Sequence, residues 1–570
     1  MAPGQHQPER RRRRLHAAGL SSPLLPAPAV LLVLVGFVLP LGVLVVYSLW
    51  PTQDGEVVHQ WTLDNWRRLF TQGEYLSSLL KTVAFISLAS AITVVLTFPF
   101  AYFVATKVRP SRRLVWLLLA IIPFWTSYLI RVFAWLNLFG DAGLINDALL
   151  RIGLVGEPLG IFANGRPAII MTFVYLLFPL AFLSAYIAIE RMNPLLLEAA
   201  SDLGARRWRA LTHITLPIAR SGILGGFILS FIAMMGDYVT PQLIGGTEGT
   251  FFSNLVINQF GSSVQWGFGT TLALVLLATV FLLLIAVRTA FGAVSAAGEY
   301  TRGFTHQRAP WLFAYALGYL GFLYVPMFLL VLFAVNDSER SGLPFEGFTL
   351  RWFGSVFDNP LLVESLWISL RVAAVAVGVS VVLGTLAAVQ LSRTTGRLRA
   401  ANLAVISMPL FLPPVVLGLA IIIGLNALDI QRGLWTITLA HIILTLPVVT
   451  LLVLVRLEGL DRNQELAALD LGARPWKAFL RISVPQALPG ILAGALIAFA
   501  LSMDEFILTF LVTGSDSTLP LYIYGSLRFR LSPELNAVSA LILGASFLLV
   551  LAAALISIKT DRRSTKELQA

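Results

Sequence analysis

The apolar positions along this chain fall into long stretches that are separated by short polar segments. A helix needs about 20 predominantly apolar residues to cross a lipid bilayer. Twelve stretches meet this requirement, at 29–49, 82–106, 114–139, 168–189, 222–246, 268–287, 312–336, 367–391, 402–425, 433–455, 489–513 and 538–558. The pattern therefore predicts an all-α integral membrane protein with about 12 transmembrane helices.

Composition supports the same class of protein. Of 570 residues, 57% are hydrophobic and 12% are charged, and the mean hydropathy is +0.81. This chain has too few polar residues to cover the surface of a soluble protein of its size. The chain has no cysteine, which excludes disulfides, thiol catalysis, iron–sulfur clusters and cysteine zinc sites.

The placement of charge predicts the orientation in the membrane. With the N-terminus in the cytoplasm, the cytoplasmic segments hold 29 Lys and Arg against 11 Asp and Glu, and the external segments hold 10 against 16. Positive residues concentrate on the cytoplasmic side of membrane proteins, so both termini are expected there. The net charge of +11 is then a topology signal, and no nucleic-acid partner is expected. The first stretch follows Arg10–Arg14 and is interpreted as an uncleaved anchor.

The chain also contains an internal repeat. Residues 199–217 align without gaps to 467–485, with 11 of 19 positions identical at an offset of 268. The same offset relates Asp237 to Glu505. Two parallel six-helix halves are therefore expected. The expected organisation is an Arg-rich tail (1–28), a first domain (29–288), a linker (289–311), a second domain (312–558) and a cytoplasmic tail (559–570).

The repeated block has the pattern of a helix, a turn and a second helix. Acidic residues near the start of 198–202 favour a helix N-terminus, and Gly204 suits the left-handed position that ends a helix. Residues 206–214 are expected to form a second short helix with Trp208 and Leu211 on its apolar face. One interpretation is an amphipathic helix that only seats the loop on the membrane. The repetition in both halves favours a docking surface for a cytoplasmic partner present in two copies.

At these residues the chain resembles a known family. The segment EAASDLGARRWRALTHITLP (198–217) resembles the EAA loop of binding-protein-dependent ABC importer permeases. The resemblance implies that each loop is a coupling helix that fits a groove on an ATP-hydrolysing subunit. One departure is present, because Leu466 occupies the aligned glutamate position and Glu465 precedes it. The nominated coupling residues are Glu198, Ala199, Ala200, Asp202 and Gly204 in the first half, and Glu465, Ala467, Ala468, Asp470 and Gly472 in the second.

The resemblance extends beyond the loops. Segments 122–135 and 236–246 resemble the B-type permease of spermidine/putrescine importers, and segments 323–338, 503–514 and 531–543 resemble the C-type permease. It implies two fused ABC type-1 permease domains in a bacterial cytoplasmic (inner) membrane. It further implies two copies of a cytoplasmic ABC ATPase, an extracytoplasmic solute-binding protein and no cofactor. The implied substrates are polyamines, or another small solute such as an amino acid derivative, a phosphonate or ferric iron.

The sequence shows no catalytic or metal-binding motif of its own. It has no Gly-Lys dipeptide and hence no phosphate-binding Walker loop, so ATP hydrolysis is expected on a separate subunit. The six histidines lack metal-ligand spacing. The chain is therefore expected to be a transport subunit, neither an enzyme nor a metal protein. An ion-coupled secondary transporter is the alternative, but it would have no reason to duplicate the EAA loop.

Ionisable residues in the fifth stretch of each half are candidates for the translocation path. Charges within the hydrocarbon region are costly and usually face a cavity or a partner, and neighbouring aromatic rings could add cation–π contact. The alternative is that the acids reach water at the external end of the span, or pair with Arg131 or Arg371. The candidates are Asp237, Tyr238, Asp504, Glu505 and Phe506.

Overall fold

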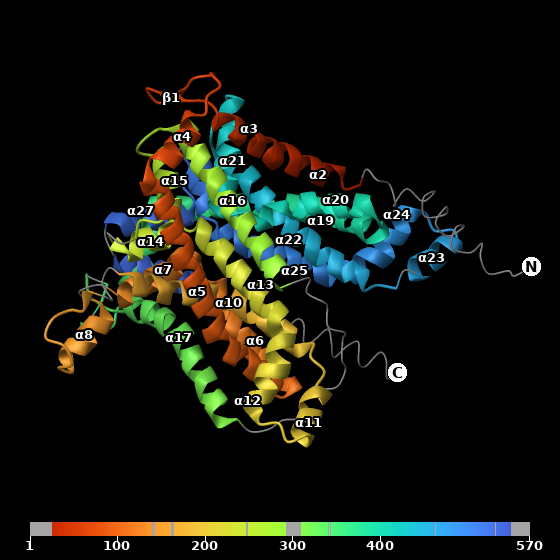
Figure 1. Ribbon diagram of the computed structural model, residues 1–570, viewed down its shortest axis with the longest axis horizontal. Coiled ribbons are helices and arrows are strands. Elements are labelled where there is room, and N and C mark those ends of the chain that lie inside the picture. The colour runs from red at the N-terminus through yellow and green to blue at the C-terminus, as the bar shows by residue number, and fades with distance from the viewer. Residues whose placement is uncertain are drawn as a thin grey trace, which may run out of the picture. The chain divides into compact units, whose positions relative to one another are not determined.

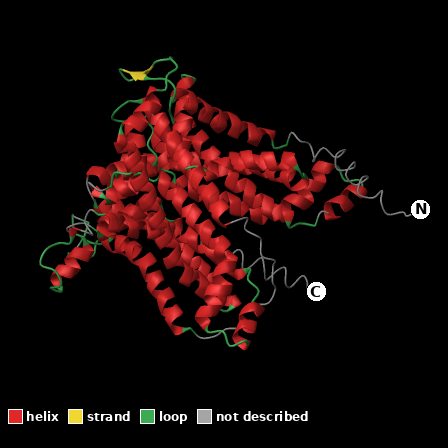
Figure 2. Ribbon diagram, in the orientation of Figure 1, coloured by secondary structure: helices red, strands yellow, loops and turns green. Residues whose placement is uncertain are grey.

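The computed structural model describes residues 25–139, 143–160, 165–246, 249–291, 309–339, 341–342, 344–461, 463–529, 532–545 and 547–548. Almost all secondary structure in these residues is helical (Figure 2). One hairpin joins β1 (Thr52–Gln53) to β2 (Glu56–Val57). The predicted Arg-rich tail, linker and C-terminal tail lie wholly or largely outside the described residues, so the proposed domain boundaries stay a prediction.

Most helices of the first half recur in the same order in the second half, and Figure 1 labels them along the chain. The first half contains α2 (Ala27–Val33), η1 (Leu34–Val38), α3 (Leu39–Tyr47), α4 (Asp64–Thr71), α5 (Gly73–Thr106), α6 (Pro110–Ile121), η2 (Ile122–Trp125), α7 (Tyr128–Leu138), α8 (Leu144–Arg151), α10 (Arg166–Glu190), α11 (Leu195–Asp202), α12 (Arg207–Ala210), η3 (Leu211–Thr215), α13 (Leu216–Gly236), α14 (Val239–Ile244), α15 (Phe252–Phe260) and α16 (Trp266–Phe291).

The second half contains α17 (Pro310–Ala334), α18 (Arg351–Asp358), α19 (Pro360–Arg393), α20 (Arg397–Ser407), η5 (Met408–Phe411), α21 (Pro414–Ala427), α22 (Leu434–Glu458), α23 (Asn463–Asp470), α24 (Pro475–Ala478), η6 (Phe479–Ser483), α25 (Val484–Asp504), α26 (Ile507–Val512) and α27 (Leu519–Phe529). Helices α4 and α5 correspond to α18 and α19 at an offset of 287, and α10 to α14 correspond to α22 to α26 at 268. The repeat seen in the sequence thus extends through most of each half.

The expected all-α membrane class is confirmed. Among the described residues, nine helices are long and apolar enough to cross a membrane, or up to 11 if two bent pairs each count as one span. The bent pairs are 110–124 with 128–138, at 82°, and 397–411 with 414–427, at 106°. The predicted third spans (114–139 and 402–425) are therefore each broken into two helices at a sharp bend. Prolines 123, 413 and 414 lie at these bends, where a missing N–H and a fixed φ interrupt a helix.

The predicted fifth spans (222–246 and 489–513) also need correction. Helix α13 ends at Gly236 and α25 at Asp504. The next residue is extended in each half, with ψ 114° at both Asp237 and Glu505, and a six-residue helix follows. These acids therefore lie at a helix break after the span and not within a continuous helix.

The helix that the sequence predicts at 206–214 is not separate from the fifth span. Helix α12 continues through the π-turn η3 directly into α13, and α24 continues through η6 into α25. Pro217 lies in the first turn of α13, where its ring would clash with the carbonyl four residues earlier. A π-turn widens the backbone at that point. This accounts for a helix that continues across a proline.

The described residues form two compact units that differ from the sequence halves. One comprises residues up to 63, 266–274 and 361–522, and the other comprises 64–265, 275–360 and residues from 523. In the first unit α3 packs on α21, and α2 packs on α20 and α22. In the second unit α17 packs on α5, α6 and α7. The first helix of each half therefore packs against the main helices of the other half.

Close packing at the centre of each unit depends on glycine. Helix α10 packs against α5 and α13, and α22 packs against α25. A Cβ atom on Gly222 would lie 2.1 Å from the backbone oxygen of Ser184, and one on Gly490 would lie 2.7 Å from Cβ of Arg456. These two glycines are equivalent at the offset of 268. Both repeats therefore use a small residue to let the fourth and fifth spans approach closely.

Candidate functional site

The first repeated loop ends helix α11 with a Schellman turn. Gly204 has φ +74°, a left-handed conformation that costs little only without a Cβ atom. The Ala205 N–H donates to the Ala200 carbonyl at 2.9 Å, and the Gly204 N–H donates to the Ser201 carbonyl at 2.9 Å. These bonds satisfy carbonyls that the helix end leaves free. The left-handed role predicted for Gly204 is confirmed.

The second loop repeats this geometry. Gly472 has φ +86°, the Ala473 N–H donates to the Ala468 carbonyl at 3.0 Å, and the Gly472 N–H donates to the Leu469 carbonyl at 3.0 Å. Helices α23 and α24 begin and end at positions offset by 268 from those of α11 and α12. One nominated alanine in each loop, Ala200 or Ala468, thus supplies a carbonyl that closes the turn.

Each loop presents a leucine and a tryptophan to solvent. Leu203 and Leu471 are 87% and 89% exposed, the highest values among the large apolar side chains that the structure describes. Trp208 and Trp476 are 71% and 52% exposed. We call Leu203 with Trp208, and Leu471 with Trp476, the docking pairs. Sequence reasoning missed the two leucines, although both occur in the repeated Asp-Leu-Gly-Ala-Arg.

The charged residues of the two loops differ. Asp202 and Asp470 are exposed in both. The Glu198 side chain is half-buried, and within the described part of the chain no ion pair is recorded for it. Glu465, in contrast, pairs with Arg393 at 2.8 Å. The shift of the glutamate by one position therefore changes what the side chain contacts.

Asp237 accepts hydrogen bonds from its own helix break and from one residue of the third span. Its carboxylate accepts hydrogen bonds from the Tyr128 hydroxyl (2.7 Å), the Thr240 hydroxyl (2.6 Å), the Val239 N–H (2.9 Å) and the Thr240 N–H (3.0 Å). Two of these donors are backbone groups at the start of α14, which have no partner within that helix. Asp237 thus fixes the break between α13 and α14.

Glu505 has the equivalent place in the second half. Its Oε1 atom accepts a bond from the Leu508 N–H at 2.8 Å, at the start of α26. Asp504 is the last residue of α25, and the aromatic neighbours Tyr238 and Phe506 are buried. Arg131, considered as an alternative partner of Asp237, donates to the carbonyls of Thr126 and Leu176, whereas the hydrogen bonds that the structure describes for the Asp237 carboxylate come from Tyr128, Val239 and Thr240.

A buried histidine stabilises the second break, and sequence reasoning assigned it no role. His441 of α22 lies 2.7 Å from the Ser502 hydroxyl of α25 through Nδ1 and 2.9 Å from the Thr509 hydroxyl of α26 through Nε2. It therefore joins the two helices on either side of Glu505. Its only sequence signal is a histidine within the apolar stretch 433–455. No group of three His, Cys, Asp or Glu residues that could hold a metal occurs in the described ranges.

These features define a multi-pass membrane protein with two copies of one helical unit. The family described as "Binding-protein-dependent transport system inner membrane component" matches residues 97–293 and 380–562. The chain belongs to this family. It is accordingly the inner-membrane transport component of a binding-protein-dependent system, with two permease domains fused in one polypeptide.

Three curated relatives illustrate the similarity. The chain is 35% identical over 271 residues to the putrescine transport system permease protein PotI of Escherichia coli, covering 46% of this chain and 96% of the relative. It is 32% identical over 249 residues to the spermidine/putrescine permease protein PotC of Escherichia coli, covering 44% and 94%. It is 32% identical over 243 residues to PotB of Haemophilus influenzae, covering 42% and 84%. Each relative has the length of about half of this chain.

Two solved structures also match. A bacterial ABC transporter involved in the import of alginate matches at 17% identity, with a TM-score of 0.37, covering 47% of this chain and 94% of that chain. The alginate transporter in complex with an alginate-bound periplasmic protein matches at 18% identity, with a TM-score of 0.34, covering 41% and 84%. The family assignment rests on the sequence matches, because these TM-scores are low.

Proposed function

We propose that this chain forms the whole membrane-spanning part of an ATP-driven polyamine importer. The observation that carries the proposal is the pair of repeated loops, each with a left-handed glycine and an exposed docking pair at the same register. An exposed apolar patch on a membrane protein outside its lipid-facing surface indicates a partner. Two equivalent patches suit two copies of one partner.

The partner of the docking pairs is a cytoplasmic ABC ATPase. The sequence has no Walker loop, so the energy for import comes from another subunit. One copy of this chain supplies two coupling loops and therefore binds two ATPase subunits. On the opposite face, a solute-binding protein delivers the substrate, as the family description implies.

The substrate class follows from the relatives. The three relatives above are named for transport of putrescine or of spermidine and putrescine. We assign the helix breaks at Asp237 and Glu505 to the translocation path, because acids at equivalent breaks suit a cationic solute. Asp237 accepts four hydrogen bonds, so its first role is to fix the geometry of the helix break.

Uptake tests the proposal directly. Cells that express this chain with its ATPase and binding protein should accumulate labelled putrescine or spermidine, and an excess of unlabelled polyamine should compete. Uptake should stop when ATP is depleted while the proton gradient is maintained. Uptake that persists in ATP-depleted cells would show an ion-coupled transporter. Competition by a phosphonate, ferric iron or an amino acid derivative, but not by polyamines, would change the substrate.

The orientation has its own test, which the absence of cysteine makes simple. The proposed orientation places both termini and both coupling loops in the cytoplasm. In right-side-out vesicles a membrane-impermeant maleimide should label Leu154→Cys, in the external segment with α8, and should not label Leu203→Cys. Both positions are exposed, so labelling reports the side of the membrane. The opposite result would reverse the topology.

A further inference from the structure

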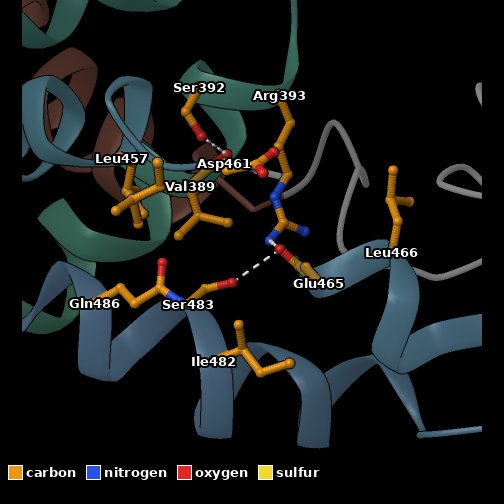
Figure 3. A pocket seen from close by; sticks show the side chains of 11 residues that line it. Val389, Ser392, Arg393, Leu457, Asp461, Glu465, Leu466, Ile482, Ser483 and Gln486 are labelled. Carbon is orange, nitrogen blue, oxygen red and sulfur yellow. Dashed lines mark hydrogen bonds and ion pairs between the residues drawn. The ribbon is translucent and has the colours of Figure 1, made fainter. Parts of the chain in front are cut away.

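The second coupling helix is joined to the membrane domain by an ion pair. Arg393 is the last residue of α19, and Glu465 lies in the first turn of α23. One guanidinium nitrogen of Arg393 donates to both carboxylate oxygens of Glu465, at 2.8 and 2.9 Å. The Ser483 hydroxyl of η6 donates to Oε2 of Glu465 at 2.8 Å. Figure 3 shows the Arg393 and Glu465 side chains pointing toward each other, with Ser483 beside them.

This ion pair is partly removed from water. The side chains of Arg393 and Glu465 are only 10% and 13% exposed. The Arg393 guanidinium also lies 5.9 Å from the centre of the Phe479 ring of η6. Charge-assisted hydrogen bonds are stronger than neutral ones, and removing one partner of a buried pair leaves a costly unpaired charge. The pair therefore holds α23 more firmly than an exposed surface ion pair would.

The pair lies in a pocket between the coupling helix and the cytoplasmic ends of three membrane helices. The pocket is lined by residues of α19, α22, α23, η6 and α25 (Figure 3). Leu466, which replaces the glutamate of the first loop, lines this pocket as well. The apolar lining residues are Val389, Leu457, Leu460, Leu466 and Ile482. Glu465 and Leu466 of the second coupling helix thus both line a pocket against their own membrane domain.

The residues that the structure describes in the first half show no equivalent of this arrangement. At the structural offsets of 287 and 268, the positions of Arg393, Glu465 and Ser483 are taken by Thr106, Leu197 and Thr215. None of these three side chains carries a charge. The two halves differ in this ion pair in particular, because another ion pair is present in both of them.

That second ion pair supplies a matched control. Arg113 of α6 pairs with Glu190 of α10 at 3.4 Å, and Arg399 of α20 pairs with Glu458 of α22. Glu190 and Glu458 are equivalent at the offset of 268. These pairs join the third and fourth spans and do not involve α11 or α23.

We propose that Arg393, Glu465 and Ser483 form an internal latch that fixes the second coupling helix to its own membrane domain. The first coupling helix lacks this latch and keeps Glu198 for the ATPase. The two loops therefore transmit force differently, one through a charged contact with the partner and one through the latch. The coupling consequence rests on the proposed function, whereas the latch itself does not.

The latch is tested first on this chain alone, in lipid nanodiscs without any ATPase. A nitroxide label on Leu471→Cys, one residue before Gly472, reports the mobility of the second loop. Glu465→Gln should increase the mobile fraction of its spectrum about twofold or more, because the ion pair is lost. The same substitution should leave a label on Leu203→Cys unchanged, and Glu458→Gln should leave both labels unchanged. An unchanged spectrum at position 471 would overturn the proposal.

A charge exchange then tests the coupling in the assembled transporter. Arg393→Glu and Glu465→Arg should each lower substrate-stimulated ATP hydrolysis on the order of tenfold, and the double variant should recover most of it. If Glu465 instead contacts the ATPase, Arg393→Glu alone would leave substrate-stimulated ATP hydrolysis intact. The double variant would then remain as impaired as Glu465→Arg alone. That outcome would overturn the latch. If no ATPase binds the wild-type chain, the proposed function fails and the nanodisc result still decides the latch.

Discussion

The Tyr128 hydroxyl donates a hydrogen bond to the Asp237 carboxylate across 2.7 Å, and these residues lie at two different helix breaks in the first half. Tyr128 begins α7, directly after the bend in the third span, and Asp237 follows the end of α13. The Tyr128 hydroxyl also lies 2.7 Å from the Thr240 hydroxyl of α14. The two breaks are therefore fixed to each other by one buried polar network.

This network predicts unequal effects of neutralising the two acids. Asp237→Asn should lower the free energy of unfolding by about 1–3 kcal/mol, because an amide cannot accept all four hydrogen bonds. Glu505→Gln should cost less, because the bond that its Oε1 atom accepts from the Leu508 N–H can also be accepted by an amide oxygen. Thermal unfolding in detergent measures both.

Uptake by the same variants tests the path assignment. Tyr128→Phe removes one donor and keeps the charge of Asp237, so it separates the loss of the network from the loss of the acid. The double variant Asp237→Asn with Glu505→Gln should lower polyamine uptake more than Tyr128→Phe does, at equal amounts in the membrane. Undiminished uptake in the double variant would exclude these carboxylates from the path.

The left-handed glycines predict a purely backbone effect at the coupling loops. A Cβ atom on Gly204 or Gly472 would meet nothing within 4 Å, so substitution strains only φ. Gly204→Ala should cost about 1 kcal/mol, and Gly204→Val should cost more because a β-branched side chain is stiffer. We expect less ATPase to co-purify with the Gly204 variants than with the wild-type chain. Gly318→Ala is the control, since that glycine has open space and lies within α17.

The docking pairs predict where a charge interrupts binding of the ATPase. Leu203→Asp and Leu471→Asp should each weaken binding by roughly tenfold or more, because an exposed leucine that becomes buried contributes about 1.5–3 kcal/mol. Folding should be unaffected, because both side chains are solvent-exposed in the chain alone. Leu154→Asp, at an exposed site in the segment that contains α8, should leave binding unchanged. Binding is measured by titration of ATPase onto the chain in nanodiscs. Equal binding by all three variants would remove these leucines from the interface.

The class of the fold and the position of the loops could be predicted because local sequence patterns determine these features. Apolar stretches and the repeat at 268 are properties of neighbouring residues, and Gly204 has a conformational requirement of its own. The breaks after Gly236 and Asp504 were missed because apolar residues occur on both sides of each break. An apolar pattern specifies that a segment lies in the membrane, but not whether its backbone is continuous.

The contacts that distinguish the two halves were beyond the sequence for another reason. Arg393 and Glu465 are 72 residues apart, and the first helix of each half packs on helices of the other half. Pairing of this kind depends on tertiary packing, which no local periodicity encodes. The alignment showed that Glu465 stands one position earlier in its loop than Glu198 does. It did not show that Glu465 pairs with Arg393.

His441 predicts that the second helix break depends on one neutral imidazole. Thr509 donates its hydroxyl hydrogen to the Glu505 carbonyl at 3.1 Å, so its oxygen accepts from Nε2–H of His441. Nδ1 of the ring then accepts from the Ser502 hydroxyl. A single neutral tautomer satisfies both contacts. The equivalent positions of His441 and Ser502 in the first half are Phe173 and Met234, so an apolar pair can fill this site.

Replacing His441 alone should therefore be worse than replacing it together with its partner. His441→Phe should lower the free energy of unfolding by about 1–3 kcal/mol, because the buried Ser502 hydroxyl loses its acceptor. His441→Phe with Ser502→Ala should recover part of this loss, because both polar groups are then removed. Tm of the purified chain measures the difference between the two variants. If the double variant is less stable than His441→Phe by the full cost of Ser502→Ala alone, the two side chains act independently and the hydrogen bond does not stabilise the break.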